Sequence, residues 1–262
     1  MYSYYIYTYV YSNSEFLLSG KTVVLHINGP ILGDTQLLDA VLEDVSILHL
    51  LGVQVVLIAG VRELLDIRIQ QDPSRTSDFY QDMRITDART LTDLKELSGL
   101  ARFEIESSLA KSYSGKPGKS GINVISGNFF YSGKPVGVRD GIDFKFTGEV
   151  RKVEVENLNQ RLEQGDVVLL TSLAYSPSGE VFNVPSEMLA AEVAAQMSAT
   201  KLIYWTEGQT VLDQRSDKPQ QSLQLRQAEA LLERLKAETN TTDSKGGIPP
   251  GSVANFRRTL EM

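Results

Sequence analysis

The segments TVVLHI at residues 22–27 and QVVLIA at residues 54–59 decide the fold of this chain. Each is a short run of mostly β-branched and aliphatic residues that ends at a glycine-containing turn, the first at residues 28–30 and the second at Gly60. Between them, residues 34–51 repeat apolar side chains with helical spacing. This strand–helix–strand order predicts two buried parallel strands joined by a right-handed crossover.

The rest of the chain continues this α/β rhythm with one interruption. Residues 122–153 carry short strand-like pieces separated by glycines, which predicts antiparallel hairpins inserted into a mainly parallel α/β core. The other elements expected are helices at residues 62–69, 90–111, 154–163, 186–197 and 223–237, strands at residues 167–171 and 202–205, and a turn at residues 176–179.

Both ends of the chain differ from this core. Residues 1–19 form a tyrosine-rich extension that is interpreted either as an edge strand or as an altered start of the chain. Residues 238–262 are rich in Thr, Asn, Ser, Gly and Pro and show no apolar period, which predicts an irregular or disordered tail. The core domain is therefore expected at residues 20–237. The first 18 residues contain no basic residue, so no targeting signal is visible.

Composition argues against several classes of function. The 262 residues include no cysteine and only two histidines, so no thiol chemistry and no metal site are expected. No apolar run reaches the ~18 residues that a membrane span needs. The formal net charge of −7 disfavours nucleic acid as a partner. Small-metabolite binding suits this composition better than nucleic-acid or membrane binding.

The tripeptide Gly118-Lys119-Ser120 looks like the end of a phosphate-binding P-loop, but its context does not fit. A P-loop has a glycine five residues before its second glycine, where this chain has Tyr113. It also follows a strand, whereas a helix is expected here. The segment 114–121 is therefore interpreted as a surface loop.

Residues at the strand ends are the candidate binding residues. Ligands of an open parallel sheet bind at the carboxyl ends of its strands, where Gly29 and Gly60 would let backbone N–H groups approach an anion. Both glycines are also consistent with plain turns. Arg84 could bind a substrate carboxylate in bidentate fashion, or it could pair with Asp82 or Asp87.

Asn183, Ser186 and Glu187 lie around the start of the helix expected at residues 186–197. Ser186 suits the N-cap position, and Glu187 suits the positive end of the helix dipole. Asn183 could hold a ligand amide or carboxylate. His26 lies in a buried strand and is interpreted as a hydrogen-bonded core histidine. Neither His26 nor His49 stands beside a nucleophile in the sequence, so no catalytic triad is predicted.

Several segments resemble the amino-acid-kinase fold and, more closely, the kinase-like N-terminal domain of N-acetylglutamate synthases, the acetyltransferases that open arginine biosynthesis. The resemblance covers about residues 20–237 and implies a three-layer α/β/α fold with inserted β-hairpins. Segment 202–208 looks closest to plant and algal members. The segments that carry the resemblance are GKTVV (20–24), LEDVSILHLLGV (42–53), RITD (84–87), PVGVRDGIDF (135–144), TGEVR (147–151) and YSPSGEVFN (175–183).

The resemblance also implies that the kinase machinery is degenerate. In kinase members, a lysine that stabilises the transferring phosphoryl group occupies the position of His26, and a glycine pair occupies the positions of Asn28 and Gly29. An aspartate that organises the catalytic lysines lies near the position of Glu187. An imidazole cannot replace a fixed ammonium aimed at developing phosphate charge. No kinase activity, no catalytic residue and no bound ATP are therefore expected.

Other positions keep the family pattern. Arg84 and Asn183 match the residues that hold acyl-amino-acid carboxylates in kinase members. Gly60 lies in the counterpart of a glycine triplet that binds substrate and phosphate. With Gly29, these residues predict a site for a small carboxylate metabolite, which would be N-acetylglutamate, glutamate or arginine.

The leading hypothesis is a non-catalytic, kinase-like regulatory or ligand-binding domain of an N-acetylglutamate synthase. The synthase acetyltransferase domain, which carries the acetyl-CoA site, is not matched in this chain, so no cofactor is expected. The segment of the arginine-feedback site is not matched either. The alternatives are an active acetylglutamate-kinase-type enzyme and a non-catalytic partner subunit. The family further implies a homo-oligomer or association with a full-length subunit, in the cytoplasm or a plastid.

Overall fold

The computed structural model describes residues 18–81, 83–111 and 121–206, together with two short strands, β14 (Leu212–Asp213) and β15 (Lys218–Pro219). The chain divides into two units, Met1–Thr206 and Glu207–Met262. In the second unit, β14 and β15 pair antiparallel. The predicted helix at 223–237, the tail, the P-loop-like tripeptide and most of the N-terminal extension lie outside the described residues.

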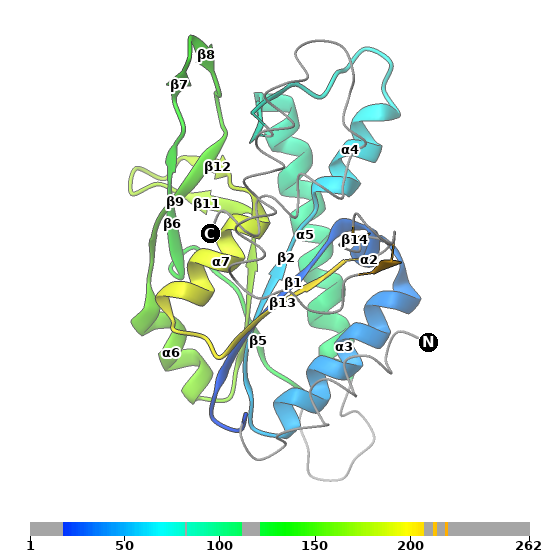
Figure 1. Ribbon diagram of the computed structural model, residues 1–262, viewed down its shortest axis with the longest axis vertical. Coiled ribbons are helices and arrows are strands. Elements are labelled where there is room, and N and C mark those ends of the chain that lie inside the picture. Colours follow the sequence, from blue (N-terminus) through cyan, green and yellow to red (C-terminus); the bar gives the residue numbers. More distant parts are fainter. Residues whose placement is uncertain (1–17, 82, 112–120, 207–211, 214–217, 220–262) are drawn as a thin grey trace. The chain divides into compact units, whose positions relative to one another are not determined.

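A five-stranded parallel sheet forms the centre of the first unit (Figure 1). In spatial order its strands are β13 (Lys201–Trp205), β1 (Thr22–Ile27), β2 (Gln54–Ala59), β10 (Val167–Thr171) and β5 (Val124–Ile125). The two apolar runs singled out in the sequence are thus neighbouring strands, β1 and β2, which pair in parallel as expected. Because all five strands run parallel, their carboxyl ends meet at one edge of the sheet.

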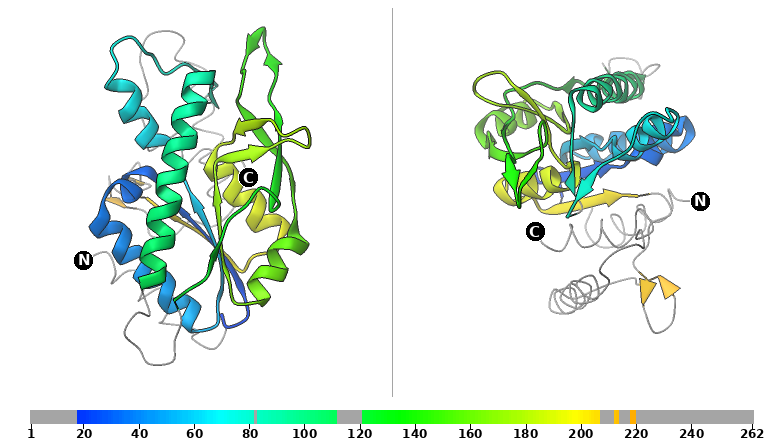
Figure 2. Two further views of the ribbon diagram at one scale, coloured as in Figure 1. Left: turned by 180° about the vertical axis from the view of Figure 1, so that it is seen from behind. Right: turned by 90° about the horizontal axis from the view of Figure 1, so that it is seen from above.

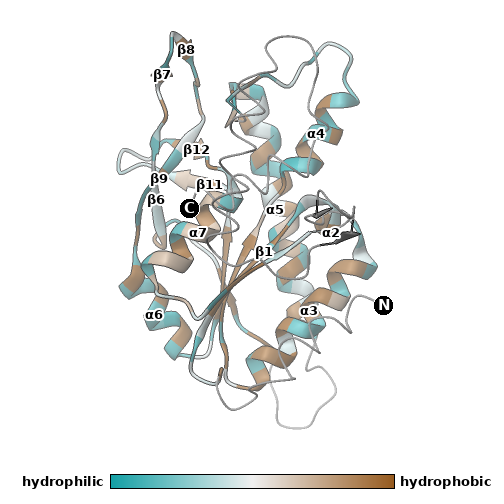
Figure 3. Cartoon of the chain, viewed as in Figure 1, coloured by the Kyte–Doolittle hydropathy of each residue, from teal (hydrophilic) through white to brown (hydrophobic). Residues whose placement is uncertain are grey.

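Helices cover both faces of this sheet and give three layers (Figure 2). α3 (Thr35–Leu50) and α5 (Ala88–Lys111) pack on one face, and α6 (Val155–Glu163) and α7 (Ser186–Gln196) pack on the other. A strand that is covered on both faces is apolar along its length, as the brown central strands in Figure 3 show. The predicted α/β/α fold is therefore confirmed.

The remaining elements surround the carboxyl edge of the sheet. A second, four-stranded sheet has the order β12-β11-β6-β9; the short hairpin β7–β8 forms the tip of the arm made by β6 and β9, and β3–β4 is a separate hairpin (Figure 1). These elements are α2 (Gly29–Gly33), α4 (Arg62–Gln70), β3 (Phe79–Tyr80), β4 (Met83–Arg84), β6 (Tyr131–Pro135), β7 (Val138–Arg139), β8 (Ile142–Asp143), β9 (Gly148–Val153), β11 (Leu173–Tyr175) and β12 (Val181–Asn183).

Three local expectations differ from the structure. β5 was expected among the inserted hairpins, yet it pairs in parallel with β10 in the main sheet. The turn expected at residues 28–30 is instead the start of α2, because Asn28 caps this helix and Pro30 has the backbone angle of a first helical turn. The polar stretch before α5 contains the β3–β4 hairpin, which no clear alternation in the sequence had indicated.

A buried carboxyl group in α3 makes the stability of this fold depend on pH. Asp44 is 7 % exposed, and burial raises its pKa to about 6, with Glu43 acting in the same direction. The folded chain therefore holds this proton more tightly than the unfolded chain does. The resulting stabilisation is complete below about pH 4 and is lost as the pH rises through about 6.

We expect Asp44→Asn, which remains neutral, to raise the free energy of unfolding by about 1–2 kcal/mol at pH 7 and to change it little at pH 4. Urea unfolding of wild type and variant at both pH values measures this difference. Glu43→Gln, at an exposed position on the same helix, serves as the control and should have a smaller effect. An equal gain of the Asp44 variant at both pH values would contradict the assigned cause.

Candidate functional site

The carboxyl end of β1 meets the start of α7 around His26. Successive strand residues point to opposite faces, so His26 shares the face of Val24, which packs toward α6 and α7. His26 Nε2 lies 2.9 Å from Ser186 Oγ, and Ser186 Oγ donates to Glu187 Oε2 at 3.3 Å. The ring of Tyr204, opposite His26 in β13, lies 5.3 Å from the imidazole, centroid to centroid. The imidazole is therefore enclosed by β13 and α7.

This environment keeps His26 neutral. Burial lowers the pKa of His26, and this outweighs the opposing effect of Glu187. A neutral imidazole has one N–H group. Because the Ser186 hydroxyl donates its proton to Glu187, Nε2 of His26 carries the N–H and donates it to Ser186 Oγ. Nδ1 is then an acceptor, buried without a hydrogen-bond partner among the described residues. The end of β1 therefore presents no cation.

Gly60 leaves no room for a side chain beside this cluster. Its amide donates to the Ile27 carbonyl at 2.8 Å, which joins the end of β2 to that of β1. A Cβ atom on Gly60 would lie 2.7 Å from both His26 Nε2 and Ser186 Oγ. Packing alone thus requires glycine here, and a ligand-binding role for Gly60 stays a prediction.

Gly29 is already hydrogen-bonded within the protein. Its amide donates to Glu63 Oε2 at 3.0 Å, and a Cβ on Gly29 would lie 2.7 Å from that oxygen. Burial raises the pKa of Glu63, and the charge of Glu187 acts in the same direction. The backbone N–H that was expected to approach an anion is therefore occupied by a side-chain carboxyl group.

Arg84 and Asn183, the two predicted carboxylate-binding residues, are brought together by two buried threonines. Thr147 Oγ1 donates to the Arg84 carbonyl at 2.6 Å and lies 3.0 Å from Thr86 Oγ1. Asn183 Nδ2 donates to the same Thr86 Oγ1 at 3.0 Å. These bonds link the segment that follows β4, the residue before β9 and Asn183 of β12, so they anchor the backbone of Arg84 and the side chain of Asn183.

The guanidinium of Arg84 is held by α4. It forms an ion pair with Asp66 and donates from Nη1 to Ser77 Oγ at 2.9 Å. The alternative pairing with Asp87 is not formed: the ion pair of Arg84 is with Asp66, and Asp87 accepts from the Thr90 amide at the start of α5. Asp82 lies outside the described residues. Burial lowers the pKa of Arg84, and the Asp66 carboxylate opposes this effect.

Ser186 does not cap α7 as expected. Pro185 occupies the N-cap position and makes no side-chain capping bond, so Ser186 is the first helical residue and its hydroxyl turns toward His26. Glu187 does lie in the first turn, where the helix dipole favours a carboxylate.

Four contributors to the site were missed from the sequence. Thr86 and Thr147 lie in segments that carry the family resemblance, so a signal for them existed although no role had been assigned. Glu63 and Asp66 lie on α4, where a charged residue looks like part of a solvated helix face until the helix is placed in space.

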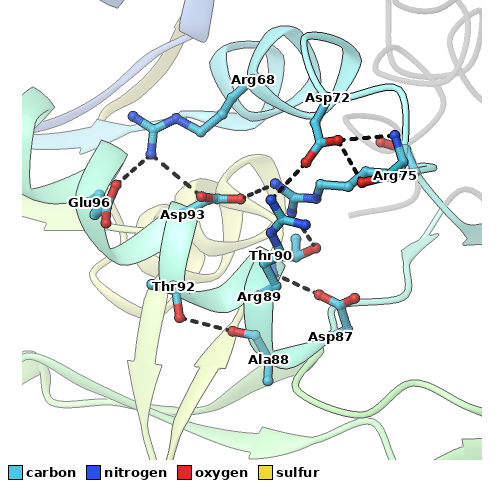
Figure 4. A network of polar contacts seen from close by, with 12 residues as sticks. Arg68, Asp72, Arg75, Asp87, Ala88, Arg89, Thr90, Thr92, Asp93 and Glu96 are labelled. Atoms are coloured by element: carbon cyan, nitrogen blue, oxygen red, sulfur yellow. Dashed lines mark hydrogen bonds and ion pairs between the residues drawn. The ribbon is translucent and has the colours of Figure 1, made fainter.

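Ion pairs hold α4 against α5 beside this site (Figure 4). Arg68 of α4 pairs with Glu96 of α5 at 2.8 Å, and Arg75 pairs with Asp93 at 2.6 Å. Exposed pairs contribute little to stability, but the Arg75 and Asp93 side chains are only 10 % and 17 % exposed. These pairs join α4 and the segment after it to α5.

Buried polar atoms without partners concentrate at the carboxyl edge of the parallel sheet. Within the described part of the chain, five of the six such side-chain atoms belong to residues at or just beyond the ends of these strands. Buried polar groups are normally paired, so such a concentration is typical of a site that a ligand completes. The five atoms are His26 Nδ1, Asn28 Nδ2, Arg62 Nη1, Ser172 Oγ and Trp205 Nε1; the sixth is Ser98 Oγ.

Two other kinds of site were sought in the structure. Among the described residues, no three His, Asp or Glu side chains are placed to hold a metal ion. None of the helices in this part of the chain is both long and apolar enough to cross a membrane.

Comparison of the sequence with known proteins gives a consistent result. Residues 21–251 match the amino acid kinase family. An amino-acid acetyltransferase from Mannheimia succiniciproducens is 33 % identical over 194 residues, covering 74 % of this chain and 43 % of the relative. One from Ralstonia nicotianae is 36 % identical over 225 residues, covering 86 % and 48 %. The chain thus spans about half the length of the curated relatives it matches.

Solved structures agree with these relatives. N-acetylglutamate synthase from Neisseria gonorrhoeae, complexed with coenzyme A and L-arginine, superposes with a TM-score of 0.81 at 26 % identity, covering 98 % of this chain and 56 % of that chain. The same enzyme has also been solved with coenzyme A and N-acetyl-glutamate. Carbamate kinase from Giardia lamblia, with a TM-score of 0.57 at 12 % identity, shares the fold. The predicted resemblance is confirmed, and the closeness to plant and algal members stays a prediction.

We expect Gly60→Ala to lower the free energy of unfolding by about 1–3 kcal/mol, because its Cβ would overlap His26 and Ser186. Gly99→Ala is the matched control. Its Cβ meets nothing within 4 Å in the middle of α5, so it should stabilise the fold by about 0.5–1 kcal/mol. Denaturant unfolding compares the two variants with wild type. A Gly60 variant as stable as wild type would show that the cluster is not closely packed.

Proposed function

The chain belongs to the amino acid kinase family, and we propose that it provides a kinase-like ligand-binding domain of the N-acetylglutamate synthase type, acting in arginine biosynthesis. In this proposal the domain binds a small carboxylate metabolite and transfers no phosphoryl group. The observation that carries it is the combination of a neutral, hydrogen-bonded His26 with a firmly supported Arg84–Asn183 pair.

The surroundings of His26 support binding without phosphoryl transfer. The resemblance places a kinase lysine at this position, where its fixed positive charge would meet the charge that develops on the phosphoryl group. His26 is buried and neutral, and its Nε2 is engaged by Ser186. The adjacent Gly29 amide is used by Glu63. These residues do not suit an ATP phosphate chain, and no step through ATP is proposed.

Arg84 and Asn183 support a carboxylate as the ligand. A guanidinium and a side-chain amide both donate hydrogen bonds to carboxylate oxygens, and bonds from the charged group are the stronger. Asp66, Thr86 and Thr147 hold the two side chains before any ligand arrives, which lowers the entropy that binding must overcome. The ligands found in the gonococcal synthase, L-arginine and N-acetyl-glutamate, are both small carboxylates.

We expect the purified chain to release no ADP above background when it is incubated with ATP and N-acetyl-L-glutamate. The reason is the missing cation at the end of β1. A coupled ADP assay measures this, with an authentic acetylglutamate kinase as the positive control. Sustained ADP formation that depends on both substrates would instead establish the alternative, an active kinase.

We expect Asn183→Asp to weaken binding of N-acetyl-L-glutamate by about tenfold or more. The carboxylate introduced at position 183 would repel the carboxylates of the ligand, and the amide donor would be lost. Calorimetric titration measures this change. Asn159→Asp, which makes the same charge change at an exposed position of α6, should bind like wild type. Equal losses in both variants would point to net charge rather than to the site.

A further inference from the structure

A second guanidinium lies beside Arg84. The guanidinium carbon of Arg84 is 4.5 Å from the centre of the Phe79 ring, and that of Arg62 is 5.3 Å from the same centre. The two cations are therefore separated by at most the sum of these distances. Phe79 is opposite Arg84 in the β3–β4 hairpin, and Arg62 is the first residue of α4. One aromatic ring thus holds both cations near each other.

The two arginines differ in their partners. Arg84 has the Asp66 carboxylate and the Ser77 hydroxyl. Within the described part of the chain, the buried Nη1 of Arg62 has no hydrogen-bond partner, and no ion pair includes Arg62. The adjacent carboxyl group, that of Glu63, accepts the Gly29 amide instead. A buried N–H of a charged group costs folding free energy unless a ligand supplies its acceptor.

We infer that Arg62 and Arg84 together bind a small dicarboxylate, with one carboxylate on each guanidinium. Arg84 has donors left for a ligand, because its bonds to Asp66 and Ser77 use two of its five N–H groups. The inference rests on the proposed carboxylate-binding function and narrows its ligand. The second carboxylate of N-acetylglutamate or glutamate finds a donor in Arg62, whereas arginine has one carboxylate and carries a guanidinium that the charge of Arg62 repels.

Calorimetric titration of the full chain with N-acetyl-L-glutamate and N-acetyl-L-glutamine tests this inference, because the two ligands differ by one carboxylate. Wild type is expected to bind the dicarboxylate at least about tenfold more tightly. Arg62→Gln should lose most of that preference, and Arg62→Lys, which keeps the charge, should retain part of it. Arg68→Gln, on the same helix but paired with Glu96, is the matched control and should behave like wild type.

Thermal unfolding separates ligand binding from a purely structural role of Arg62. Arg62→Gln breaks no ion pair and loses only the contact with Phe79, so without ligand it should unfold close to the wild-type temperature. It should then gain less stability than wild type from added N-acetyl-L-glutamate.

The outcomes distinguish this inference from the function on which it rests. If wild type binds both ligands equally, or if Arg62→Gln keeps the preference, the dicarboxylate assignment is wrong and the carboxylate-binding function stands. If wild type binds none of N-acetyl-L-glutamate, N-acetyl-L-glutamine, glutamate and arginine, both the dicarboxylate assignment and the carboxylate-binding function are wrong.

Discussion

β1 is hydrogen-bonded to parallel strands on both sides, β2 and β13, and helices cover both of its faces. A strand in this position has no free edge, and a slip of one residue would exchange its two faces. Leu25 and Ile27 consequently face α3 and α5, while Val24 and His26 face α6 and α7. The contact of the imidazole with Ser186 at the start of α7 follows from this alternation, as does the need for glycine at the end of β2.

Close packing at the end of β1 also decides where charge lies. At the strand end nearest α7, His26 Nε2 is hydrogen-bonded to Ser186, and burial lowers the pKa of His26, so the imidazole there is not a cation. Positive charge lies instead on Arg62 and Arg84, beside the β3–β4 hairpin. With its cations beside the β3–β4 hairpin and none at the end of β1, the domain is suited to bind an anionic ligand. It is not suited to stabilise a phosphoryl-transfer transition state at the end of β1.

This arrangement has a cost in stability. Buried donors and acceptors without partners lower the free energy of unfolding, and within the described part of the chain they gather at one edge of the sheet. The opposite end of the sheet has no such group in that part of the chain. Proteins tolerate buried polar atoms without partners mainly where a bound ligand supplies the missing hydrogen bonds. The concentration of such atoms at the carboxyl edge of the sheet therefore supports a binding site there.

The sequence by itself determined the strand–helix–strand core, the inserted hairpins and the family, because local apolar periodicity and turn residues specify these features. The helix expected at residues 34–51 is α3, within one residue at each end. Only the tertiary structure decided that Ser186 turns to His26, 160 residues away, and that Arg84 pairs with Asp66. Those contacts depend on how α7 and α4 are placed on the sheet, and no local pattern encodes a distance between segments so far apart in the chain.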